Sequence, residues 1–170
     1  LARYAHGEAV QTVIAAGLVG EGSAATKLAI LDAAAASGLQ QIPKKWAGPL
    51  RGLLASDSVQ LVARTVATVR ALAKSAIDDA FVTRLQSLVN NKKYSSELRI
   101  SALATIYIGR SNAKLEPSSL HFVCKCLSVD LPVRARARAV DVLLVAKLND
   151  AELEVLVESL SAAGPMELKR

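Results

Sequence analysis

Apolar residues recur at every third or fourth position through most of the chain, and this spacing predicts α-helices rather than strands. Each apolar stretch is bounded by residues that favour helix ends. Ser, Asp and Asn can cap the first turn, Pro suits the first helical position, and Gly suits the position after the last turn. The pattern predicts eight or nine helices, grouped in repeat units at about residues 8–38, 43–74, 78–109 and 117–147, with a last helix at 149–163.

Some helix ends can be predicted residue by residue. Ser23 is expected to cap a helix that runs to Ala36, and Gly38 follows just beyond its end. The glycines at positions 17–22 are expected to form the loop before this helix. Pro49 lies inside another helical stretch, where we expect a kink or a short first turn.

A short motif returns near the start of the second helix of each pair, at offsets of 34, 39 and 35 residues. It consists of an aliphatic residue, a polar residue or Arg, two further residues and then Ala. Repetition at this period indicates an architecture of stacked helical units. The copies are Val59-Gln60-x-x-Ala63, Leu98-Arg99-x-x-Ala102, Val133-Arg134-x-x-Ala137 and a weaker Ala25-Thr26-x-x-Ala29.

The spacing of the motif places its aliphatic residue and its alanine on one face of a helix. We therefore expect this face to point into the core, where the small alanine lets two helices approach closely. In the copy that begins at Val59, the expected inward side also includes Val62, Val66 and Val69. A single helix pair cannot bury such a face alone, but stacked pairs share a continuous core.

Composition supports this interpretation. Hydrophobic residues make up 52% of the 170 residues but aromatic residues only 4%, so the apolar mass is Ala, Leu and Val. Ala and Leu are among the best helix formers, and a core with few rings favours closely packed helices.

The segment from Leu127 to Ala137, which reads Leu-Ser-Val-Asp-Leu-Pro-Val-Arg-Ala-Arg-Ala, resembles the HEAT repeat. The other copies depart from that pattern: Leu98-Arg99 lacks the preceding Asp, and Gln60 stands where Arg is expected. The resemblance covers about residues 20–160, and armadillo repeats share much of it. It implies an all-α superhelix, a HEAT/armadillo-like solenoid of about four antiparallel helix pairs, used mainly for protein–protein contact.

The phrase Ala-Gly-Pro-Met-Glu-Leu near residue 165 is similar to segments of large bacterial multidomain proteins. Those proteins join a dehydrogenase-like propeller, helical repeats and a c-type haem domain. The chain contains no haem-binding motif, so the resemblance implies a connecting scaffold. The chain is therefore expected to be a fragment of a longer protein.

The net charge of +6 is mild for this length and favours acidic partners only weakly. Second helices line the concave surface of a solenoid, so the polar motif residues on them are candidates for partner binding. Two interpretations remain open: a basic ridge on that surface, or a ladder in which each Arg bonds to an Asp or a carbonyl of a neighbouring turn. The candidate residues are Gln60, Arg64, Arg99, Arg134 and Arg138, with Asp141 as a partner for Arg138.

The sequence offers no positive sign of catalysis, a metal site or a cofactor. Cys124 and Cys126 are two positions apart on a predicted helix, too close in sequence to pair comfortably, and are expected to be buried thiols. His6 and His121 lie in no metal-binding motif. No apolar run is long enough to span a membrane.

We therefore expect a non-catalytic scaffold that contacts proteins or neighbouring domains. The alternative is a nucleic-acid-binding HEAT-like domain with a basic concave face, which would require the arginines to converge rather than pair with acids. A third hypothesis, a HEAT-like DNA glycosylase, would require an acidic residue and aromatic residues in a basic cleft, and Trp46 is expected to be a packing residue instead.

Overall fold

The computed structural model describes residues 4–74, 77–108, 110 and 114–161. Within these ranges the chain is all-helical and contains no strand, as the apolar spacing predicts. Contacts divide the chain into two compact units, Leu1–Ser87 and Leu88–Arg170.

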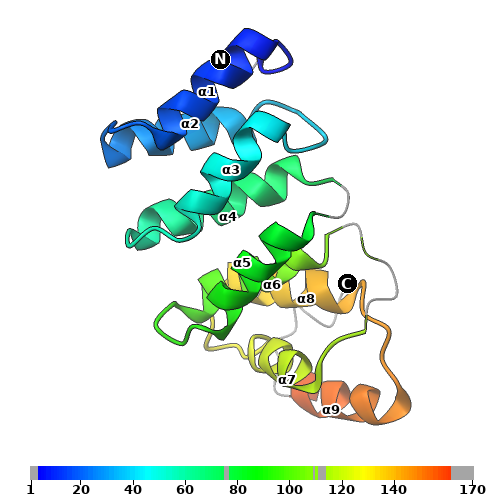
Figure 1. The fold of residues 1–170 in the computed structure, drawn as a ribbon. Coiled ribbons are helices and arrows are strands. Elements are labelled where there is room, and N and C mark those ends of the chain that lie inside the picture. Colours follow the sequence, from blue (N-terminus) through cyan, green and yellow to red (C-terminus); the bar gives the residue numbers. More distant parts are fainter. Residues whose placement is uncertain (1–3, 75–76, 109, 111–113, 162–170) are drawn as a thin grey trace. The chain divides into compact units, whose positions relative to one another are not determined.

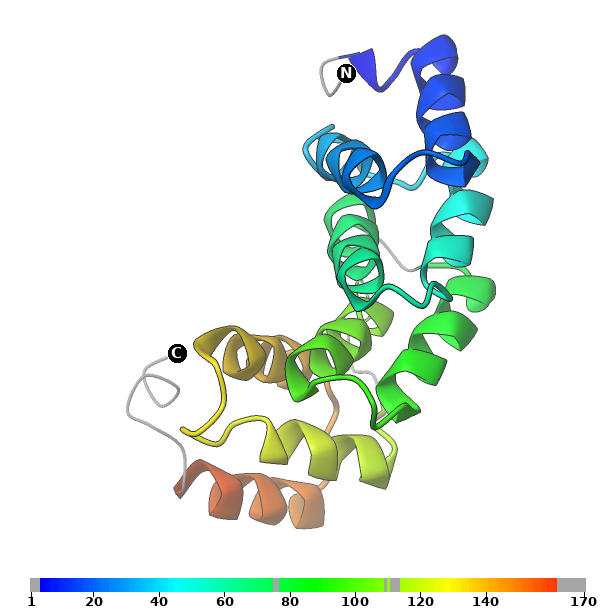
Figure 2. The same cartoon turned by 90° about the vertical axis from the view of Figure 1, so that its left-hand side faces the viewer.

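Unit 1 contains four complete helices and most of a fifth. Helix α1 packs on α2 and α3, and α4 packs on α2 and α3, so that α1 and α3 form one layer and α2 and α4 the other (Figures 1 and 2). Its helices are α1 (Glu8–Val19), α2 (Ala24–Ala35), α3 (Lys44–Leu53), α4 (Val59–Leu72) and α5 (Asp79–Asn90), whose last turn belongs to unit 2.

The core of unit 1 is built mainly from leucines and valines of these helices, around the single tryptophan. Trp46 is fully buried, and its indole N–H donates a hydrogen bond to the backbone carbonyl of Gln11 on α1. Thr68 on α4 is also buried, and its hydroxyl donates to the carbonyl of Leu31 on α2. These bonds satisfy polar groups that would otherwise be costly to bury, and each one ties two neighbouring helices together.

Unit 2 has a similar internal arrangement: α6 packs on α8, and α7 packs on α8 and α9 (Figure 1). Its complete helices are α6 (Ser96–Ile106), α7 (Pro117–Lys125), α8 (Val133–Leu143) and α9 (Asp150–Ser161). Most residues of α6 are buried. In contrast, none of the residues from Asp150 to Leu160 on α9 is fully buried.

The predicted cap at Ser23 is confirmed, and Ser58 and Ser95 cap helices in the same way. Each of these three side chains accepts a hydrogen bond from a backbone N–H in the first turn of the helix that follows. Asp78 caps α5 in the same way, by accepting from the N–H of Phe81 at 2.8 Å. Gly38 adopts a φ of 73°, a left-handed conformation that glycine takes without steric cost.

Two local expectations were less accurate. Helix α1 continues through Gly17 to Val19, so the loop begins later than the glycines suggested. A Cβ atom on Gly17 would come within 2.5 Å of Ile30 Cδ1 on α2, so the glycine allows α1 and α2 to pack closely. Helix α3 runs through Pro49, which therefore does not end it.

Candidate interaction surface

The four copies of the repeated motif do not share one environment. In α6 the expectation is confirmed, because Leu98 and Ala102 are both buried. In the other copies the expected inward face was wrong. The residues concerned are Ala25 and Ala29 on α2 and Val59 and Ala63 on α4, all exposed, together with exposed Val133 and half-buried Ala137 on α8.

The reason is a shift of the buried face by two or three residues. The core side of α4 contains Val62, Val66 and Val69, as expected, but Val59 is 57% exposed. On α8 the buried residues are Ala135, Ala139 and Val142, which leaves Val133 56% exposed. Both helices have apolar residues on more than one side, so the motif alone does not determine which side meets the core.

In unit 1 the exposed residues of α4 form a continuous line along the helix, which we call the α4 stripe: Val59, Gln60, Ala63, Arg64 and Ala67. Arg64 of this stripe forms an ion pair with Asp32 on α2, with 2.9 Å between Nη1 and Oδ1. Both side chains are about half exposed, so the pair lies on the surface that α2 and α4 share. Asp32 was not foreseen, although it precedes Arg64 by about one repeat.

In unit 2 the corresponding line along α8, the α8 stripe, comprises the exposed residues Val133, Arg134 and Leu144 and the half-buried residues Ala137 and Arg138. Arg138 pairs with Asp141 one turn along, at 2.9 Å, as the sequence predicts. Arg134 is exposed and forms no ion pair with the described residues. Leu144, the residue that ends the helix, is 77% exposed and was not foreseen as part of a surface.

Arg99 is turned away from solvent, unlike the other candidates. Its Nε–H donates to the backbone carbonyl of Val89 at 2.7 Å. Its guanidinium lies 4.3 Å from the centre of the Phe122 ring, a distance at which a cation is attracted to the ring face. Arg99 therefore links the end of α5 to α7, as the ladder interpretation expects, and contributes little to an exposed ridge.

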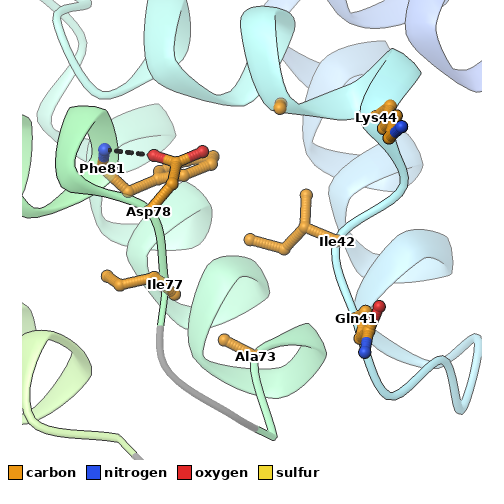
Figure 3. A pocket seen from close by; sticks show the side chains of 8 residues that line it. Gln41, Ile42, Lys44, Ala73, Ile77, Asp78 and Phe81 are labelled. Carbon is orange, nitrogen blue, oxygen red and sulfur yellow. Dashed lines mark hydrogen bonds between the residues drawn. The ribbon is translucent and has the colours of Figure 1, made fainter.

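Unit 1 also contains a cleft of about 340 Å³, which was not predicted. Figure 3 shows it between the segment before α3 and the start of α5. Asp78 at its rim pairs with Arg51 at 3.3 Å while also capping α5, so both carboxylate oxygens are engaged. The lining consists of Gln41, Ile42, Lys44, Ala47, Ala73, Ile77, Asp78 and Phe81. No local pattern predicts the cleft, because its walls come from two segments, residues 41–47 and 73–81, that are distant in sequence.

The side chains that could act as nucleophiles or metal ligands lie apart from one another. Cys124 and Cys126 are free and buried, as expected. Burial raises the pKa of the Cys126 thiol to about 11, and the charge of Arg99 partly opposes that rise. His6 and His121 are exposed, and the described ranges contain no group of three or more His, Cys, Asp or Glu side chains able to hold a metal ion. Because Trp46 is buried, it cannot stack on a nucleic-acid base.

Comparison with protein-family models, curated proteins and solved structures found no match to the chain. Among the helices of the described residues, none is long and apolar enough to cross a membrane.

Proposed function

We propose that the chain is a non-catalytic helical-repeat scaffold of the HEAT/armadillo type, a solenoid of about four helix pairs. Its partner would be another protein or a neighbouring domain of the same polypeptide. The packing of α1 on α3, α2 on α4, α6 on α8 and α7 on α9 supports this proposal, since stacked repeats place corresponding helices side by side.

The observation that carries the proposal is the exposure of the same motif position in both units. Val59 and Val133 begin α4 and α8, and more than half of each side chain is exposed. An isolated exposed valine needs no explanation, but aliphatic residues that recur beside polar or basic ones form a surface that a partner can cover. Binding energy would come mainly from the apolar side chains, and Gln60 and Arg134 would set orientation.

The nucleic-acid alternative is weaker than the charge of the chain suggests. Arg64 and Arg138 are paired with acids and Arg99 is turned inward, so only Arg134 of the four arginines has no partner among the described side chains.

The proposal can be tested by photocrosslinking in extract from the source organism. Benzoylphenylalanine would replace Val59 or Val133, and in a matched control it would replace Val13, an exposed valine of α1. A discrete adduct is expected from Val59 or Val133 and not from Val13. It should disappear when Gln60→Glu or Arg134→Glu is combined with the crosslinker beside it. Adducts of equal yield from Val13, or none from either stripe, would contradict the proposal.

Fluorescence anisotropy with a labelled DNA duplex distinguishes the alternative. Phosphate-driven binding weakens steeply between about 50 and 200 mM salt. A protein-binding scaffold should show no binding even at the lower salt. Binding with a steep salt slope, reduced by Arg134→Glu, would favour the nucleic-acid function.

A further inference from the structure

The last helix of unit 2, α9, differs in charge from the rest of the chain. It contains four acids, Asp150, Glu152, Glu154 and Glu158, and no lysine or arginine, whereas the whole chain has a net charge of +6. Glu152 is used locally: it forms a capping box with Asn149, in which each side chain accepts a hydrogen bond from the other residue's backbone N–H. The other three acids are exposed and form no ion pair with the described residues.

The two sides of α9 have different surroundings. Glu152, Leu156, Ser159 and Leu160 are half-buried and lie on one side of the helix. Helix α7 is the neighbour of α9 in Figure 1, and Ser159 shares a crevice with His121 and Lys125 of α7. This side is therefore the one that packs within unit 2.

The opposite side combines apolar residues with acids. Leu153 and Val157, four residues apart, are 45% and 62% exposed. They line a shallow groove of about 480 Å³ together with Asp150, Glu154 and Glu158. We call these five residues the α9 face. On a helix they occupy positions i, i+3, i+4, i+7 and i+8, which follow a single side over two turns.

We infer that the α9 face is a docking site for an amphipathic helix of a partner protein, with aliphatic residues along its centre and lysine or arginine at its edge. Leu153 and Val157 supply the apolar contact, in which a helix lays its own apolar side against them. Asp150, Glu154 and Glu158 follow one another at intervals of four residues, so bases at the same interval on the partner can face them.

The charge selects the partner. An acidic helix or an anionic membrane surface would be repelled by the three carboxylates, whereas a basic helix gains in both association rate and orientation. This site is separate from the α4 and α8 stripes, where Arg64 and Arg138 are paired with acids of their own unit. Its existence therefore does not depend on the proposed function of those stripes.

The test uses the full chain and a fluorescein-labelled model peptide about five turns long, with leucines on one side and lysines on the other. A second peptide has the same leucines but glutamates in place of the lysines. Anisotropy at about 150 mM salt should show binding of the lysine peptide and none of the glutamate peptide, because exposed charges remain effective only over short distances at that salt.

Substitutions then locate the site. Leu153→Ser and Glu154→Lys should each weaken binding of the lysine peptide about tenfold or more. Glu21→Lys, which makes the same charge change in a loop of unit 1, should leave binding unchanged. Because no described side chain of α9 is fully buried, the variants should retain the helical circular dichroism of the parent.

Three results would overturn the inference: no binding of the lysine peptide, equal binding of the glutamate peptide, or equal weakening by Glu21→Lys and Glu154→Lys. If Arg134→Glu abolishes a partner adduct in the crosslinking experiment while the lysine peptide still binds, both surfaces are real and independent.

Discussion

Helices α6 and α8 have the same motif near their first turn, but its aliphatic residue is buried in α6 and exposed in α8. Leu98 on α6 is 6% exposed, whereas Val133 at the equivalent position of α8 is 56% exposed. Arg99 is turned inward over Phe122, and Arg134 is exposed. The motif begins at the third residue of α6 but at the first residue of α8, and the neighbouring apolar residues decide which side is buried. The same residue types therefore stabilise the fold in one helix and remain available to a partner in the other.

Shortening the aliphatic residue of the motif should give the largest difference between the two helices. Leu98→Ala removes buried methyl groups from the core, so we expect a loss of about 2–4 kcal/mol in the free energy of unfolding. Val133→Ala removes an exposed side chain, so the expected change is within about 0.5 kcal/mol. Urea unfolding followed by circular dichroism measures both, and equal losses would mean that the two positions are not differently buried.

Replacing the arginine of the motif should give a smaller difference. Arg99→Met would leave the carbonyl of Val89 without its 2.7 Å hydrogen bond and remove the contact with Phe122, for an expected loss of about 1–3 kcal/mol. Arg134→Met should change the free energy of unfolding by less than about 0.5 kcal/mol. The same unfolding assay serves, with Arg99→Lys as a further variant that keeps the charge but loses the Nε–H donor.

The pH dependence of stability should reflect the burial of the Cys126 thiol. Burial raises the pKa of Cys126 from 9.0 to about 11, so the unfolded chain releases this proton at lower pH than the folded protein does. Proton release on unfolding makes this contribution to stability decline as the pH rises from 9 to 11. Cys126→Ala should remove that part of the decline, seen as a difference between unfolding curves at several pH values.

Arg99 lowers the pKa of Cys126, so Arg99→Met should raise it further, whereas Arg134→Met should not. Titration of the thiolate by ultraviolet absorbance, taken as the difference from Cys126→Ala, gives this comparison directly. An identical thiol pKa in the two arginine variants would argue against the inward position of Arg99.

The smallest effect is expected for the ion pair between Arg64 and Asp32 on the surface of unit 1. Both side chains are about half exposed, and pairs of this kind typically contribute about 0.2–1 kcal/mol. A double-mutant cycle with Arg64→Ala and Asp32→Ala should give a coupling in that range that shrinks when salt is added. A coupling as large as the loss expected for Arg99→Met would indicate that Arg64 is more structural than its exposure suggests.

Features with a local cause could be predicted from the sequence. Ser23, Ser95 and Asp78 cap helices because each needs only a short polar side chain and the three residues that follow it. The helical class follows from the apolar spacing for the same reason.

Features that depend on distant residues could not be predicted. Whether Val59 or Val62 of α4 faces the core depends on how α4 packs on α2 and α3. Apolar residues lie on more than one side of α4, so the sequence pattern alone does not decide this. The pairing of Arg64 with Asp32 and the cleft beside Asp78 likewise need segments that meet only in the folded chain.

The central claim is that one motif faces inward in α6 and outward in α4 and α8. It can be tested by labelling single cysteines, Val59→Cys, Leu98→Cys and Val133→Cys, in a Cys124→Ala/Cys126→Ala background, with a thiol reagent under native conditions. We expect the cysteines at 59 and 133 to react at nearly the rate of the unfolded chain and the one at 98 to react far more slowly. A cysteine at 98 that reacts as fast as that at 133, or protection at 59 and 133, would contradict the claim.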